Sequence, residues 1–183
     1  MPRYFAFLRA INVGGQHNVK MEYLRSLFES LSFTNVETFI ASGNVIFESK
    51  SRNARALKKQ IEEHLRVSLG YEVATFLRTD KELAEIAQYK PFTETDIKSA
   101  AAINIGFVDE TFSTEVKKAL MVLKTEIDQF HVHEREVYWL SRLTQSKSTF
   151  SNAVFERILN GKATFRGVNT ISRLATKYRL SPS

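Results

Sequence analysis

The order of strand and helix patterns along the first ninety residues constrains the fold of this chain more than any other feature. Alternating segments rich in aromatic and β-branched residues predict strands, and apolar residues spaced three and four apart predict amphipathic helices. In chain order, the predicted elements are strand 4–8, helix 20–31, strands 36–41 and 44–49, helix 54–70 and strand 72–78. This βαββαβ order is that of a ferredoxin-like split βαβ unit.

A ferredoxin-like unit has a defined strand order and places its helices on a defined side of the sheet. We expect four antiparallel strands in the order 4-1-3-2, with two helices on one face. Three local signals agree with the predicted boundaries. Ser42-Gly43-Asn44 suits a hairpin turn, and Gly70 suits a left-handed helix end. Thr79 and Glu82 form a capping box that opens a third, short helix.

The second half of the chain partly repeats this order. Its predicted elements are strand 101–108, helix 113–124, strands 127–133 and 136–141, helix 150–159 and a final short helix from about residue 169. The similarity concerns element order and not the residues themselves. The predicted fold class is therefore α+β, with a ferredoxin-like subdomain at 1–91 and a smaller α+β subdomain at 99–183, joined near residues 89–98.

Positive charge is concentrated in the last quarter of the chain. Residues 142–183 hold eight of the 26 Lys and Arg but only one of the 20 Asp and Glu, a net charge of +7, whereas the rest carries −1. Such asymmetry favours an acidic partner, either nucleic acid or a phosphorylated small molecule. The alternative is a set of helices whose charges simply face water. On the first interpretation we expect Lys147, Arg166 and Arg173 to be exposed, unless Arg166 pairs internally with Glu156.

Two polar, glycine-containing turns should meet at one end of the first sheet, because the first and second strands both run toward it. The residues of this predicted anion-binding corner are Arg9, Asn12, Gly14, Gly15, Lys20, Ser42, Gly43 and Asn44. Backbone N–H groups, a helix N-terminus and two cations would favour an anion there. The spacing matches neither a Walker loop nor a dinucleotide fingerprint. Alternatively, the glycines serve chain geometry and the two asparagines bond local backbone.

Other chemistry is sparse in the sequence. The chain has no cysteine, which excludes disulfides and thiolate sites and fits a cytoplasmic protein. No apolar stretch is long enough to cross a membrane, and no cofactor motif is present. His131 and His133 lie two apart on a predicted strand without an identifiable third ligand, so we interpret them as surface imidazoles and predict no metal. No catalytic constellation stands out, and enzymatic activity stays open.

Five short segments together resemble a known family. They are LRAINVGG with VKM, then ASGNVIFES, then SK followed by Asn152 and Glu156, then ATFRGVNT. In this order they resemble the bacterial domain of unknown function 1697 family over nearly the whole chain. The resemblance implies a small cytoplasmic protein with a ferredoxin-like first half, and it implies no established activity. The matching positions are Arg9, Asn12, Gly14, Gly15, Lys20, Ser42, Gly43, Asn44, Lys147, Asn152, Glu156, Arg166, Asn169 and Thr170. Ala10 departs from the pattern, where glycine is expected.

Three functions are compatible with these features. The first is a nucleic-acid or polyphosphate binding module, for which Phe5, Phe7 and Phe47 on the central strands are either stacking platforms or core. The second is an enzyme on a nucleotide-like or phosphorylated metabolite, in which Arg166 and Asn169 close over the polar corner. The third is a protein-interaction module. We expect an anionic ligand bound at the corner and on the basic C-terminal surface.

Overall fold

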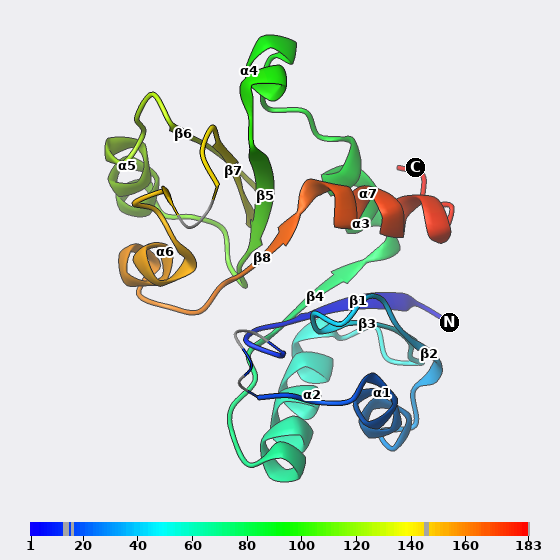
Figure 1. The fold of residues 1–183 in the computed structure, drawn as a ribbon. Helices are drawn as coiled ribbons and strands as arrows, with labels where there is room; N and C mark the ends of the chain where they lie inside the picture. The colour runs from blue at the N-terminus through cyan, green and yellow to red at the C-terminus, as the bar shows by residue number, and fades with distance from the viewer. Residues whose placement is uncertain (13–14, 16, 145–146, 183) are drawn as a thin grey trace. The chain divides into compact units, whose positions relative to one another are not determined.

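The chain divides into two compact units (Figure 1). The computed structural model describes residues 1–12, 15, 17–144 and 147–182. The first unit comprises Met1–Ile86 together with Leu174–Ser183, and the second comprises Ala87–Arg173. The last residues of the chain thus belong with the first unit, although the sequence grouped them with the second half. Division into folding domains at 1–91 and 99–183 stays a prediction.

The first unit has the predicted sheet topology. Its elements are β1 (Arg3–Leu8), α1 (Met21–Glu29), β2 (Thr34–Thr38), β3 (Asn44–Glu48), α2 (Ala54–Leu69), β4 (Thr75–Thr79) and α3 (Asp80–Gln88). The four strands are antiparallel in the order β2-β3-β1-β4. This confirms the expected 4-1-3-2 order with β1 in the interior of the sheet.

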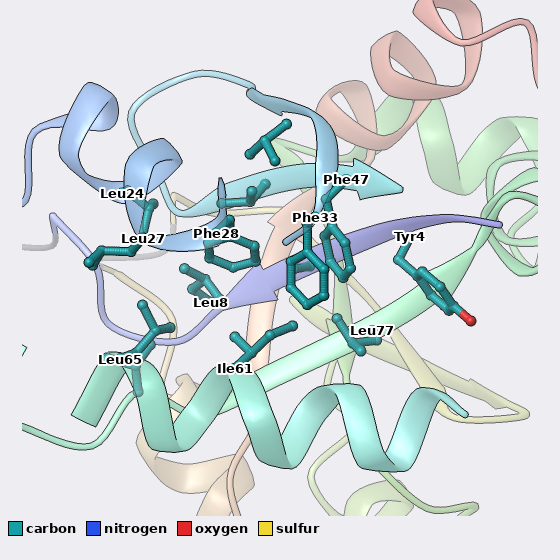
Figure 2. Close-up of a cluster of buried hydrophobic side chains, with 14 of the residues drawn as sticks. Tyr4, Leu8, Leu24, Leu27, Phe28, Phe33, Phe47, Ile61, Leu65 and Leu77 are labelled. Carbon is teal, nitrogen blue, oxygen red and sulfur yellow. The ribbon is translucent and has the colours of Figure 1, made fainter. Parts of the chain in front are cut away.

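One apolar core joins α1 and α2 to the same face of this sheet. Because side chains alternate along a strand, Tyr4, Ala6 and Leu8 of β1 share that face. They belong to one buried cluster with Phe28 of α1 and Ile61 of α2 (Figure 2). The predicted pair of helices on one face is thereby confirmed.

Phe47 of β3 lies within this core. Its ring stacks on Phe33 at a centroid distance of 4.3 Å and on Tyr4 at 5.5 Å (Figure 2). Phe5 and Phe7, on the opposite face of β1, are also buried. All three aromatic side chains weighed as stacking platforms are therefore packed in the interior.

Local signals set most boundaries of the first unit. Gly70 ends α2 with φ +84°, and Thr79 and Glu82 bond reciprocally at the start of α3, as a capping box does. The second strand is shorter than predicted. Ile40 adopts φ +50° and the Phe39 N–H donates to the Asn44 carbonyl at 3.0 Å, so the hairpin loop takes up residues assigned to the strand.

The C-terminal segment is tied to the edge strand of the first sheet. Lys177 Nζ lies 2.7 Å from Glu37 Oε2, and the Tyr178 hydroxyl donates to the same oxygen at 2.9 Å. The Arg3 guanidinium lies 4.9 Å from the centre of the Tyr178 ring, and Phe5 meets that ring edge-on at 5.4 Å. These contacts explain why the last residues belong to the first unit.

The second unit repeats the complete βαββαβ topology. Its elements are α4 (Glu94–Ser99), β5 (Ala102–Phe107), α5 (Thr114–Val122), β6 (Asp128–His133), β7 (Glu136–Ser141), α6 (Asn152–Leu159), β8 (Thr164–Gly167) and the start of α7 (Val168–Lys177). The sheet order β6-β7-β5-β8 reproduces that of the first sheet. Strand β8 escaped prediction because it spans four residues, includes an arginine and runs directly into α7.

Helix α4 also went unpredicted, since it lies in the expected linker. Its N-cap Thr93 accepts a hydrogen bond from the Asp96 N–H at 3.1 Å. This cap holds a single short helix in a segment without an apolar stripe.

Helices α5 and α6 cover one face of the second sheet (Figure 1). The core beneath them contains Trp139 and Phe150, whose ring centroids are 4.8 Å apart. The Trp139 indole Nε1 donates to the buried Asp128 carboxylate at 2.8 Å, and the Ser148 hydroxyl donates to the same carboxylate at 2.7 Å. A buried carboxylate is costly unless hydrogen-bonded, so these donors are integral to the core.

Trp139→Phe removes one of these donors and part of the core volume. We expect it to lower the free energy of unfolding by about 3 kcal/mol, from the lost charge-assisted bond and the cavity. In the Asp128→Ala background the same substitution should cost less by about 1 kcal/mol or more, because the carboxylate is gone. Urea unfolding of the four proteins measures this coupling. Strictly additive losses would show that the bond contributes nothing.

The Glu37 contact predicts a pH effect. The hydrogen bond from Lys177 is the largest cause that holds the Glu37 pKa below its usual value of 4.5, with Tyr178 acting in the same direction. A lowered folded-state pKa stabilises the protein above the unfolded value, and this contribution disappears as the pH falls through the folded one. Urea unfolding should therefore show Glu37→Gln less stable than wild type at pH 7, with the gap narrowing by pH 3. Glu85→Gln, at an exposed position on α3, is the control. A gap that is constant with pH would contradict the expectation.

Candidate functional site

The loop after β1 and the β2–β3 hairpin lie side by side at one end of the first sheet. The Leu8 N–H donates to the Gly43 carbonyl at 2.9 Å, and Asn12 Nδ2 donates to the Ala41 carbonyl at 3.2 Å. The Arg9 N–H bonds the Ala74 carbonyl at 2.9 Å, which fixes the start of the loop against the residue preceding β4. The predicted meeting of the two turns is confirmed.

The asparagine amides of this corner bond nearby backbone. Asn12 Oδ1 accepts from the Val19 N–H at 2.7 Å, and its Nδ2 donates to the Val19 carbonyl at 3.1 Å. Asn44 is 1% exposed and donates to the Phe39 carbonyl at 2.9 Å and to Ser42 Oγ at 3.1 Å. These bonds brace the two turns, as the structural alternative for the corner supposes.

Left-handed backbone is concentrated in the same two turns. Ala10, Asn12 and Ile40 have φ between +50° and +59°, and Gly43 has φ +75°. A Cβ at Gly43 would lie 3.2 Å from the Leu8 carbonyl oxygen and 3.1 Å from Ile11 Cβ, so both space and φ require glycine there. Ala10 keeps the unusual backbone that a glycine would adopt without strain. Alanine in place of the expected glycine at position 10 therefore adds backbone strain to the turn without preventing its formation.

The other described residues of the predicted corner do not by themselves enclose a binding site. Gly15 and Lys20 are exposed, and a Cβ on Gly15 would meet no atom within 4 Å. Gly14 lies outside the described residues. The corner as a binding site stays a prediction.

Arg166 was expected to be an exposed cation, and this expectation is wrong. The side chain is 8% exposed, and burial lowers the pKa of its guanidinium to about 10. Its Nη1 donates to Thr164 Oγ1 at 2.8 Å and to the Phe165 carbonyl at 2.9 Å. The reason is that Arg166 lies on β8 directly opposite Ile105 of β5, so it shares the sheet face that carries this buried residue.

Two other motif residues fix the approach to β8. Asn152 Nδ2 donates to the Ala163 carbonyl at 3.0 Å, and Glu156 Oε2 accepts from the Ala163 N–H at 2.9 Å. Asn152 and Glu156 lie one turn apart on α6, so one helix face holds both the N–H and the carbonyl of the buried residue Ala163. Glu156 Oε2 is thus bonded to backbone, and the internal pair of Glu156 with Arg166 stays a prediction.

The exposed cations of the second unit lie elsewhere. Lys147 and Arg173 are exposed, as expected, and Asn169 is exposed as well. Arg157 and Lys162, which the sequence contributed only to the overall charge, line a hollow of about 610 Å³ at the C-terminal end of α6. Asn160 closes that helix with φ +52° and lines the same hollow. Within the described part of the chain, neither Arg157 nor Lys162 makes an ion pair.

A second hollow of about 300 Å³ adjoins the first. Gly161 and Lys162 line both hollows, and the second one is bounded otherwise by the loop 108–113, Val116 of α5 and Leu159. Helices α5 and α6 pack against each other (Figure 1), and the shared lining residues make the two hollows neighbours on the second unit. No sequence motif marks this surface.

Comparison with known proteins places the chain in a family. The family model described as Protein of unknown function (DUF1697) matches residues 1–138. The chain belongs to the DUF1697 family. The structure is similar to that of the conserved bacterial protein SP0830 from Streptococcus pneumoniae, at 22% sequence identity and a TM-score of 0.73, covering 96% of this chain and 97% of the other. This likeness supports the α+β fold. No curated protein matches.

In the DUF1697 chain the two histidines expected to be surface imidazoles lie on β6, where His133 is exposed and His131 is half-buried. Tyr89 stacks on His133 at 4.0 Å, and its hydroxyl is hydrogen-bonded to His131 Nε2 at 2.5 Å. Burial, followed by the charge of His133, lowers the pKa of His131. Among the described residues, no group of three or more His, Asp or Glu is placed to hold a metal ion. None of the helices formed by the described residues is long and apolar enough to cross a membrane.

We expect adding a Cβ at Gly43 and removing the Cβ of Ala10 to change the free energy of unfolding in different ways. Gly43→Ala should lower the free energy of unfolding by about 2 kcal/mol, because the positive φ and the close Leu8 and Ile11 atoms both oppose a Cβ. Ala10→Gly relieves backbone strain at a similar φ and should leave stability unchanged or raise it by up to about 1 kcal/mol. Urea unfolding distinguishes the two. A loss in Ala10→Gly as large as in Gly43→Ala would contradict this account.

Proposed function

We propose that this DUF1697 protein binds an anionic, phosphate-bearing ligand at the hollow beside the C-terminal end of α6. The observation that carries the proposal is that two exposed cations, Arg157 and Lys162, line one hollow without an ion pair in the described part of the protein. The anionic ligand expected from the charge distribution is retained. Its contacts move from Arg166, which is buried, to these two side chains.

The chemistry of the lining suits a phosphate group. A guanidinium donates two parallel hydrogen bonds to phosphate oxygens, and an ammonium adds a compact positive charge. The Asn160 side chain adds an amide donor on the same wall. Glu156 also lines the hollow, but one carboxylate oxygen accepts the Ala163 N–H, and the two cations outnumber it.

The other predicted surfaces support binding less well. Phe5, Phe7 and Phe47 are buried and offer no platform for stacked bases. At the polar corner, the asparagine amides already bond backbone atoms. The hollow at α6 is therefore the better place for an anion in this chain.

Titration with inorganic pyrophosphate, followed by amide NMR, tests the proposal. In the wild type we expect saturable shifts at the amides of Asn160, Gly161 and Lys162. Each lost cation–phosphate contact should weaken binding several-fold at moderate ionic strength, so Arg157→Ala with Lys162→Ala should abolish detectable saturation.

The matched control removes the same charge elsewhere. Lys59→Ala with Lys81→Ala takes two exposed lysines from α2 and α3. This control should keep the wild-type response. Equal weakening in both double variants would mean that pyrophosphate senses only net charge, and the proposal would then be wrong.

A further inference from the structure

The two adjoining hollows differ in the chemistry of their lining, and this difference favours a small anionic ligand over a polymeric one. Building on the proposed function, we infer that the ligand is a small phosphomonoester that carries one planar, largely apolar ring, the chemical class of a nucleoside monophosphate. Its phosphate lies at Arg157 and Lys162, and its ring occupies the second hollow, beside the loop 108–113.

The shared wall sets the connection between the two parts of the ligand. Gly161 and Lys162 line both hollows, so a molecule held by Lys162 at its phosphate extends directly into the second one. The hollows have volumes of about 610 and 300 Å³ and are open to solvent, so they leave room for a small ligand that keeps one side in water.

The second hollow has an apolar floor. Phe112, Val116 and Leu159 line it, and all three belong to or pack against the core of the second unit. Core side chains that reach a surface hollow bind a flat apolar ring by removing its faces from water. A bare phosphate gains nothing from this floor.

The rim of the second hollow carries groups of the opposite character. Asp109 and Glu110 carry carboxylates there and also interact with other groups of the protein, while Thr111 and Ser113 carry hydroxyls, the latter accepting the Val116 N–H. Carboxylates accept hydrogen bonds from sugar hydroxyls and ring N–H groups, as acidic residues do at ribose sites. They also repel a second phosphate, so a polynucleotide, which carries a phosphate at every residue, is disfavoured.

Three probes test this inference: adenosine 5′-monophosphate, ribose 5-phosphate and a single-stranded ten-residue oligothymidine. By calorimetry or NMR titration, the mononucleotide should bind about tenfold more tightly than ribose 5-phosphate, the gain expected from burying one base. Only the mononucleotide should shift the amides of Phe112 and Val116. The oligothymidine should bind no more tightly than ribose 5-phosphate.

Two variants separate the hollows. Thr111→Trp fills the second hollow from its exposed rim, so it should abolish the tenfold preference and leave ribose 5-phosphate binding unchanged. Thr34→Trp, at an exposed position on β2, is the control for added aromatic surface. Glu110→Gln removes one rim charge and should raise oligothymidine affinity relative to the mononucleotide.

The outcomes distinguish the two proposals. Equal binding of the mononucleotide and ribose 5-phosphate, or a preference that survives Thr111→Trp, overturns the inference and leaves the proposed function standing. Tighter binding of oligothymidine than of the mononucleotide also overturns it, in favour of a polymer. If neither pyrophosphate nor any of the three probes binds, the proposed function fails and the inference fails with it.

Discussion

The position of β1 between two hydrogen-bonded neighbours is the constraint on which the first unit depends. Its register is fixed on both sides, with Phe5 opposite Ile46 on β3 and opposite Arg78 on β4. A shift of one residue would move Tyr4, Ala6 and Leu8 away from α1 and α2 and expose the core. The same pinning delivers the chain after Leu8 directly beside Gly43, so the polar corner follows from the strand pairing. Strand β5 occupies the equivalent place in the second sheet.

Much of the fold was predictable because most helices and strands show the spacing of apolar residues that is typical of their type. The order of elements in the first half determined the strand order, and Gly70, Thr79 and Ser113 marked helix ends through local hydrogen bonds. Short or atypical elements were missed. Strand β8 is too short for a period to emerge, and Ile40 takes a left-handed conformation that a β-branched residue rarely adopts.

The candidate site was less predictable than the fold. Arg166 was expected at the surface because the C-terminal segment carries a net charge of +7. Instead, it lies on strand β8, which the sequence analysis did not predict, and the pairing of β8 with β5 places it in the interior. The hollow at α6 depends on how the loop 108–113 approaches the end of a helix some fifty residues later, and no local pattern encodes that approach. Conversely, four polar residues that the sequence analysis singled out form hydrogen bonds with backbone groups: Asn12, Asn44, Asn152 and Glu156. The residues on which the resemblance to the family rested thus include several that brace the fold through backbone hydrogen bonds.

Helix α7 begins in the second unit and ends in the first, with the boundary between Arg173 and Leu174. Tyr178 and Lys177, which contact Phe5 and Glu37, therefore follow the whole of the second unit in the chain. The four strands of the first sheet precede the second unit in the chain, whereas the C-terminal contacts of that sheet are made by residues that follow it. The first unit, whose strands are synthesised before the second unit, thus has its complete set of residues only after the second unit has been made.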